Sequence, residues 1–471
     1  MKRVIVCLLL AALTALLILH LRRQTPVPPP LPPRPWQALE AMFQQARDDA
    51  SLAGAVIGFC LLNPDGEVVF GQQSTSAFIP ASTLKTVTTA TALEKWGPDF
   101  RIETTLRATA PVVEGIIAGD VVIQGGGDPM LAMTDLESWA RILLDKGVTR
   151  ITGRIIGDGG LLPGSIYDDF WNWGDIGNGY GSGVSGLNLE HNRFTARFRP
   201  GTEVGTPAAF LLAVPEVPGV RWNNEVTTGP AGSGDGVVIH GGERTGILHL
   251  RGTVPADGAD FEVGGAAPDP ELYAAHHLRA VLINRGISVL GAAATRSRLK
   301  MDGQPFPEAG TVLLTHRSPP LIDIITSIHA TSDNHESECL YRLLGLDGNQ
   351  TPDAAVRAHW QVRGLTFQGL RMEDGCGLAR ANFIRPLDLA RLQFLTGKGP
   401  QGASYRESLL SSQDGALRWK GGAMSGVRFY TGFVKSASGA DFTFALMVNH
   451  FTDSQAVSAL RDRVLEHLRG L

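Results

Sequence analysis

The motif Ser82-x-x-Lys85 limits the possible fold and chemistry of this chain more than any other feature of the sequence. On a helix, this spacing places the Ser82 hydroxyl and the Lys85 amine one turn apart, side by side. Pro80 ends an extended segment, and residues 82–96 are predicted to form a helix. Unpaired backbone N–H groups and the positive end of the helix dipole favour negative charge that develops beside Ser82. A buried lysine with a lowered pKa can be the base that a serine nucleophile needs. The alternative is an N-cap serine followed by a solvated lysine.

Length and composition describe a globular protein of several domains. A chain of 471 residues is too long for one ordinary core, so two or three domains are predicted. A net charge of -4 argues against nucleic acid as the main partner. Outside the leader the cysteines are Cys60, Cys339 and Cys376, which form neither a disulfide framework nor a metal-ligand cluster. A Cys339–Cys376 bridge is left open.

The first residues predict export. Residues 1–21 combine a basic start with an apolar run, as in a signal peptide or a signal anchor, and cleavage is left open. Residues 22–36 are a proline-rich linker, expected to be a stiff spacer. The rest is therefore expected to be periplasmic or anchored to the outer face of the cytoplasmic membrane, touching the membrane only through this N-terminal segment.

The remaining chain divides into three stretches. Residues 37–98 are predicted to hold a helix, a hairpin and the Ser82 helix. Residues 99–311 hold two helix–glycine–strand units, separated by a Gly/Pro-rich region at about 198–262 that is typical of a small β subdomain. Residues 312–471 hold helices, antiparallel strands and a closing amphipathic helix.

Two further short motifs follow Ser82-x-x-Lys85 along the chain. Ser332-Asp333-Asn334 is predicted to lie in a loop between two helices, and Lys420-Gly421-Gly422 on a strand. Each of the three is common by chance, but all three in this order and in these contexts are not.

Together these stretches resemble the D-alanyl-D-alanine carboxypeptidase/endopeptidase family, the class C low-molecular-mass penicillin-binding proteins. Further stretches that look like the family's signatures are Phe78-Ile79-Pro80-Ala81, Gly125-Gly126-Gly127-Asp128-Pro129, Ile155-Ile156-Gly157-Asp158, Asp374-Gly375-x-Gly377-Leu378 and Ser425-Gly426. The long gap between Ser82 and Ser332 is also similar, because this family carries a large insertion there. The resemblance covers nearly all of the exported part.

The resemblance implies an α+β fold. Residues 37–98 and 312–471 would form a penicillin-binding/β-lactamase-like transpeptidase domain, with an antiparallel sheet packed against helices. Residues 99–311 would form an inserted α/β domain that carries the small β subdomain. The chemistry implied is acyl transfer without a metal or cofactor.

The resemblance also assigns roles to five residues. Ser82 would be the nucleophile and Lys85 its base. Ser332 would relay a proton to the leaving amine, Asn334 would hold the substrate backbone, and Lys420 would attract the substrate carboxylate. The stretch expected to bind substrate is Lys420, Gly421, Gly422 and Ala423, and backbone N–H groups of Ser82 and Ala423 would form the oxyanion hole.

The third motif departs from the family pattern. Where the family has K-T-G-T, this chain has Lys420-Gly421-Gly422-Ala423, so both threonine hydroxyls are absent. The expected function is therefore a slow serine D,D-peptidase that acts on D-alanyl-D-alanine ends or D-alanyl cross-links of peptidoglycan and takes β-lactams as covalent inhibitors. The balance between carboxypeptidase and endopeptidase activity is left open. The alternative is a catalytically weak cell-wall-binding protein of the same fold, and a β-lactamase would need a deacylating residue that the sequence does not reveal.

Overall fold

The computed structural model describes residues 36–308, 310–346, 348 and 350–471. The predicted leader at 1–21 and residues 22–35 of the predicted linker lie outside these residues. Within the described part of the chain, no helix is both long enough and apolar enough to cross a bilayer.

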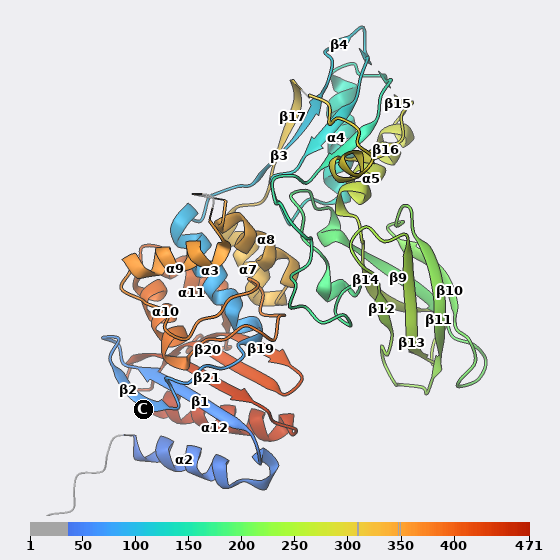
Figure 1. Ribbon diagram of the computed structural model, residues 1–471. Coiled ribbons are helices and arrows are strands. Elements are labelled where there is room, and N and C mark those ends of the chain that lie inside the picture. The colour runs from blue at the N-terminus through green and yellow to red at the C-terminus, as the bar shows by residue number, and fades with distance from the viewer. Residues whose placement is uncertain (1–35, 309, 347, 349) are drawn as a thin grey trace, which may run out of the picture.

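An antiparallel six-stranded sheet forms the base of the molecule, in the order β18-β19-β20-β21-β1-β2 (Figure 1). Its strands are β1 (Val56–Leu62), β2 (Val68–Gln72), β18 (Leu410–Ser411), β19 (Leu417–Met424), β20 (Val427–Lys435) and β21 (Asp441–Asn449). β1 precedes Ser82 in the chain and yet pairs along its whole length with β21, near the C-terminus. The two ends of the described chain are thus joined in one sheet.

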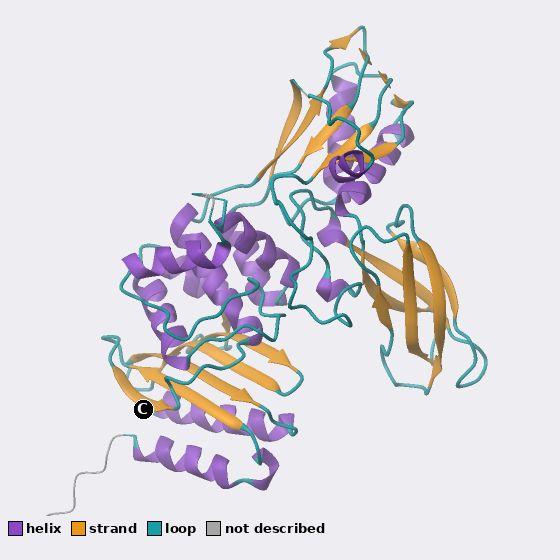
Figure 2. Cartoon of the chain, viewed as in Figure 1, coloured by secondary structure: helices purple, strands orange, loops and turns teal. Residues whose placement is uncertain are grey.

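Helices cover both faces of this sheet (Figure 2). One face carries α2 (Gln37–Asp48) and α12 (Ser454–Gly470). The other carries α3 (Lys85–Trp96), α7 (Leu321–Thr331), α8 (Asn334–Leu344), α9 (Pro352–Val362), α10 (Pro386–Lys398) and α11 (Gly402–Ser408). Side chains alternate along β1, with Phe59 and Leu61 in the core under α2 and α12, and Cys60 and Leu62 in the core under the helix layer. This two-sided burial explains why β1 is apolar at almost every position.

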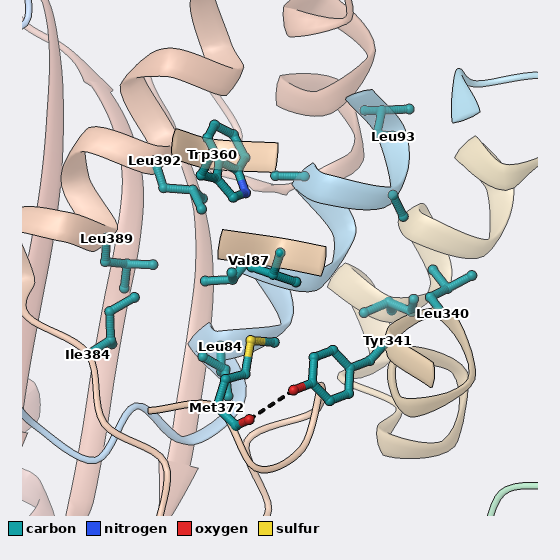
Figure 3. Close-up of a cluster of buried hydrophobic side chains, with 14 of the residues drawn as sticks. Leu84, Val87, Leu93, Leu340, Tyr341, Trp360, Met372, Ile384, Leu389 and Leu392 are labelled. Carbon is teal, nitrogen blue, oxygen red and sulfur yellow. Dashed lines mark hydrogen bonds between the residues drawn. The ribbon is translucent and has the colours of Figure 1, made fainter. Parts of the chain in front are cut away.

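The helix α3 runs through the middle of the helix layer. All residues from Lys85 to Leu93 are buried, because other helices surround it (Figure 3). Leu84 and Val87 point into the apolar cluster, where Tyr341 Oη also donates to Met372 O at 2.8 Å. The nucleophile candidate Ser82 therefore lies directly before a helix that is buried over most of its length.

The inserted part contains a five-stranded sheet, β16-β8-β6-β3-β17, and a smaller ribbon, β15-β7-β5-β4. Its strands are β3 (Glu103–Ala108), β4 (Val112–Val113), β5 (Ile116–Ile117), β6 (Val121–Gln124), β7 (Arg150–Ile151), β8 (Ile155–Asp158), β15 (Ser288–Val289), β16 (Ala293–Thr295) and β17 (Thr311–Arg317). Its helices are α4 (Met133–Asp145), α5 (Pro270–Asn284) and α6 (Arg296–Met301). β8 and β16 pair in parallel, which joins two segments far apart in sequence.

Two three-stranded sheets between these segments form the small β subdomain, β10-β9-β14 and β11-β13-β12. Its strands are β9 (Arg193–Arg199), β10 (Ala209–Val214), β11 (Arg221–Gly229), β12 (Val238–His240), β13 (Ile247–Pro255) and β14 (Phe261–Ala266). A largely irregular arm at residues 159–192 leads to it from β8 and passes beside the helix layer (Figure 1).

Two details differ from the sequence-based expectations, and the structure also decides the bridge that the sequence left open. The stretch 312–317 was expected in the catalytic part, but β17 pairs with β3 of the inserted sheet, because the chain returns beside the strand by which it left. Residues 81–84 form a 3-10 turn, so the α-helix begins at Lys85 rather than at Ser82. Cys339 and Cys376 are both buried free thiols and form no bridge.

Candidate active site

Ser82 lies in a tight 3-10 turn, Ala81–Leu84, immediately before α3. The turn is pressed against the strand β19, since a Cβ at Gly422 would lie 2.9 Å from both Ser82 N and Thr83 N. On its other side, a Cβ at Gly377 would overlap the Ala81 carbonyl, and Gly377 also has a positive φ of 84°. Glycine at these two positions lets the backbone close tightly around the Ser82 turn.

Lys85 is fully buried directly beneath Ser82. Its Nζ donates to Ser82 Oγ at 2.9 Å, to Asn334 Oδ1 at 2.6 Å and to Cys376 O at 2.6 Å. Burial lowers the pKa of Lys85, whereas the negative charge of Asp374 acts in the opposite direction. A neutral amine at this position has its lone pair beside the Ser82 hydroxyl, the arrangement that general-base catalysis requires.

The second motif links two helices at the edge of the site. Ser332 ends α7 in the left-handed conformation, with φ 62°, and Asp333 caps the N-terminus of α8. Asn334 is the first residue of α8, and its Nδ2 donates to Tyr180 O at 2.8 Å. That bond fixes the orientation of the amide, so that Oδ1 faces Lys85.

Lys420 lies on β19 and is also buried. Its Nζ donates to Ser332 Oγ at 2.9 Å and to Gly421 O at 2.9 Å. Burial lowers the pKa of Lys420 to about 7, and the positive charge of Lys85 acts in the same direction. The charge of this side chain therefore responds to pH near neutrality.

These groups adjoin a cleft of about 420 Å³. Of the residues expected to form the site, Ser82, Ser332, Asn334 and Ala423 line the cleft. Lys85 and Lys420 lie beneath it and reach it through their bonds to Ser82 and Ser332. The other lining residues are Asn172, Asp175, Tyr180, Gly377, Leu378, Arg380, Met424 and Ser425.

No motif in the sequence indicated that the arm at residues 159–192 contributes to the site. Asn172, Asp175 and Tyr180 all come from this arm and line the cleft beside Ser82. The available signal was its length, because an irregular stretch of this size inside a folded domain is usually functional. Its side chains reach the site only through tertiary packing, which no local pattern reveals.

A turn at residues 374–379 aims the carbonyl of Cys376 at Lys85. Asp374 organises this turn, with Oδ1 accepting from Gly377 N at 2.6 Å and Oδ2 accepting from Ala379 N at 2.7 Å. Trp171 of the arm also donates to Asp374 Oδ2, at 2.9 Å. Because the contact is made by the backbone carbonyl of Cys376, it does not depend on the side chain at this position.

The same turn brings Glu338, Asp374 and Cys376 close enough together to suggest a metal site. Glu338 accepts from Gly375 N at 2.7 Å and from Arg342 Nε at 2.9 Å, and burial raises the pKa of Glu338 to about 7. Because the carboxylate oxygens already accept backbone and side-chain hydrogen bonds, this cluster suits a structural role better than metal binding.

Comparison with known proteins places the chain in a family. The model of the D-Ala-D-Ala carboxypeptidase 3 (S13) family matches residues 38–469. A D-alanyl-D-alanine carboxypeptidase from an Actinomadura species is 28% identical over 457 residues, which cover 89% of this chain and 82% of the relative. The D-alanyl-D-alanine carboxypeptidase DacB of Haemophilus influenzae is 24% identical over 428 residues, which cover 85% of this chain and 86% of the relative.

The fold is also similar to a solved structure, that of penicillin binding protein 4 from Haemophilus influenzae. The TM-score is 0.80 at 19% identity, and the match covers 91% of this chain and 99% of the other. This likeness confirms the α+β fold with its large insertion. The family match over nearly the whole described chain shows that the protein belongs to the D-Ala-D-Ala carboxypeptidase 3 (S13) family and is a serine-type peptidase of that family.

Proposed function

We propose that the protein is a D,D-peptidase that cleaves D-alanyl-D-alanine ends or D-alanyl cross-links of peptidoglycan through an acyl-enzyme on Ser82. One observation carries the proposal, namely that Lys85 Nζ lies 2.9 Å from Ser82 Oγ and 2.6 Å from Asn334 Oδ1 at the floor of the cleft. In this scheme the neutral Lys85 takes the hydroxyl proton as Ser82 Oγ attacks the substrate carbonyl.

Backbone N–H groups would stabilise the oxyanion that forms in this attack. β18 pairs with Arg418 and Trp419, and among the residues that the structure describes no strand pairs with this edge of β19 from Lys420 onward. The Gly421 carbonyl accepts from Lys420 Nζ at that edge, and alternate residues of a strand direct their N–H groups to the same side. The N–H of Ala423 would therefore face the cleft together with the N–H of Ser82.

Ser332 and Lys420 would act on the leaving group and on the substrate carboxylate. Their contact of 2.9 Å gives the Ser332 hydroxyl a route by which a proton can pass to the leaving amine. Lys420 would attract the carboxylate while it is protonated. Because Gly421 and Ala423 offer no hydroxyl, this carboxylate has fewer donors than the family pattern supplies, and we infer that the enzyme is slow for that reason.

The substrate places the enzyme at the cell wall. We infer that the segment before residue 36 exports the chain or holds it at the outer face of the cytoplasmic membrane. β-Lactams would acylate Ser82 as substrate analogues, and the related penicillin binding protein 4 of Haemophilus influenzae has been solved in complex with a β-lactam.

The test compares wild type with Ser82→Ala, using a fluorescent penicillin and a peptide that ends in D-Ala-D-Ala. We expect label and D-alanine release in the wild type and neither in the variant. A wild type that takes no label and releases no D-alanine would favour the alternative, a cell-wall-binding protein with the same fold. Label in both proteins would mean that another group is the nucleophile.

A further inference from the structure

An ion pair joins the inserted part to the middle residue of the second motif. Arg193, the first residue of β9, donates from Nη1 to Asp333 Oδ2 at 2.6 Å and from Nη2 to Asp333 Oδ1 at 3.1 Å. The Asp333 side chain is only 10% exposed. Two parallel N–H···O bonds fix both the direction and the rotation of the carboxylate, which a single contact with a lysine cannot do.

The guanidinium is itself held in place by the inserted part. Tyr273 of α5 donates to the backbone oxygen of Arg193 at 2.8 Å, and Arg193 Nε donates to Ser182 Oγ at 3.3 Å. Both the backbone and the side chain of Arg193 are therefore held in place by residues of the inserted part.

Because Arg193 fixes Asp333, it also fixes the positions of the two neighbouring residues, Ser332 and Asn334. The Asp333 carboxylate accepts from Glu336 N at 3.0 Å and so caps α8, the helix that begins with Asn334. The preceding residue, Ser332, is in the left-handed region, which is uncommon for a residue other than glycine. Although burial alone would raise the pKa of Asp333, the Arg193 guanidinium holds it well below its usual range, so the carboxylate stays charged.

Neighbouring contacts come from the same region of the inserted part. His191 Nε2 lies 2.9 Å from Glu336 Oε1 in the first turn of α8. Tyr180 O accepts from the Asn334 amide, as described above. The loop that presents Ser332 and Asn334 thus rests against the inserted part.

We propose that Arg193 is a positioning residue, which holds the Ser332–Asn334 loop in its reactive geometry from within the inserted part. The proposal rests on the function proposed above. It makes the insertion part of the catalytic apparatus, because the docking of β9 sets where Ser332 meets Lys420 and where Asn334 meets Lys85.

The test measures the acylation rate constant of the full-length protein with a fluorescent penicillin, together with kcat and KM for a D-Ala-D-Ala peptide. A misplacement of about 1 Å costs about 100-fold in rate, so Arg193→Ala is expected to lower the acylation rate about 10- to 100-fold. The loss should appear in kcat with little change in KM, because Lys420 stays in place to attract the carboxylate. Arg193→Lys should fall between wild type and Arg193→Ala.

A matched control lies on the same strand. Arg197 of β9 also pairs with a carboxylate, Glu262, but both partners are about half exposed, so Arg197→Ala removes the same charge with no expected effect on acylation. Asp333→Asn preserves the helix cap and removes the ion pair. We expect it to match Arg193→Ala, with no further loss in the double variant. Millimolar guanidinium chloride, far below denaturing concentration, should restore part of the rate of Arg193→Ala.

The outcomes separate the two proposals. An acylation rate of Arg193→Ala within about threefold of the wild-type rate would overturn the positioning role. An equal loss of acylation rate in the control Arg197→Ala would also overturn it. So would a loss in Arg193→Ala that added guanidinium does not relieve. If Arg193→Ala fails to fold, as judged by thermal unfolding, Asp333→Asn takes its place, and acylation of Asp333→Asn within about threefold of wild type would overturn the positioning role. A wild type that is not acylated at all would instead refute the proposed function.

Discussion

The contact between β19 and the Ser82 turn can be tested by adding one methyl group. In Gly422→Ala the new Cβ would lie 2.9 Å from Ser82 N and Thr83 N and 3.1 Å from Pro80 O. All three are backbone atoms, so no side chain can rotate away to make room. Ordinary contacts are roughly half an ångström longer, so the strand and the nucleophile turn must separate by about that amount.

This separation should slow acylation without changing the nucleophile or its base. Since about 1 Å of misplacement costs about 100-fold, we expect the acylation rate constant of Gly422→Ala to fall about 10- to 100-fold. The comparison variant is Gly421→Ala, whose Cβ would have the Tyr430 ring at 3.8 Å and the Phe429 carbonyl at 3.9 Å as its nearest neighbours. These are ordinary contact distances, so its loss should be much smaller.

The assay is time-resolved labelling with a fluorescent penicillin, with thermal unfolding measured in parallel. A Gly422→Ala protein that is folded and labelled as fast as wild type would refute the reasoning, because the strand would then not limit the position of Ser82. Equal losses in the two variants would also refute it, since they would point to strand flexibility rather than to the close contact.

Other consequences can be measured in the same protein. Lys85→Arg should abolish labelling while the unfolding temperature is preserved, because a guanidinium stays protonated; labelling at the wild-type rate would remove Lys85 from the role of base. Because the pKa of Lys420 is lowered to about 7, its protonated fraction falls as pH rises through neutrality, so KM for a D-Ala-D-Ala peptide should increase above pH 7. Lys420→Arg should flatten that pH dependence, and an unchanged profile in this variant would contradict the assignment. Ala423→Thr should raise kcat/KM about 10- to 100-fold by returning one hydroxyl to the cleft, and Ala423→Val, of similar shape, should not; equal effects would show that shape matters and not the hydroxyl. Because β1 and β2 share one sheet with β18–β21, a chain in which Pro98 is joined to Ser318 by a short linker should keep this sheet. Circular dichroism and thermal unfolding measure this, and a disordered product would show that the sheet does not form without the insertion.

Short sequence patterns encode some parts of the fold and of the candidate site, and these parts could be predicted. The helix after Ser82, the strand that carries Lys420 and the family itself all follow from motifs of three or four residues. The pattern also located the loop of Ser332 and Asn334 between two helices, where the structure has it.

The features of the fold and of the site that the sequence did not predict depend on tertiary packing. Nothing local to Tyr180 or Arg193 indicates that they contact the second motif, because those contacts join residues about 150 positions apart. The predicted boundary between the insertion and the catalytic part, near residue 312, differs from the structure, in which β17 pairs with β3 of the insertion. The sequence of a strand does not show which of two sheets the strand joins. The hydrogen bond from Lys85 to the carbonyl of Cys376 could not be predicted, because every residue has a backbone carbonyl and the side chain does not show which one accepts.

The pairing of β1 with β21 has a consequence for biosynthesis. β1 is made among the first residues of the domain, but its partner Asp441–Asn449 is among the last. Contacts of such long sequence separation form late, so the catalytic sheet cannot close until the C-terminus has emerged. A chain cut short before Asp441 would leave an edge of β1 unpaired and would lack both β21 and α12. Premature termination should thus yield an aggregation-prone fragment. The Ser82 turn, which packs on this sheet, can take its active position only after the whole chain has been synthesised.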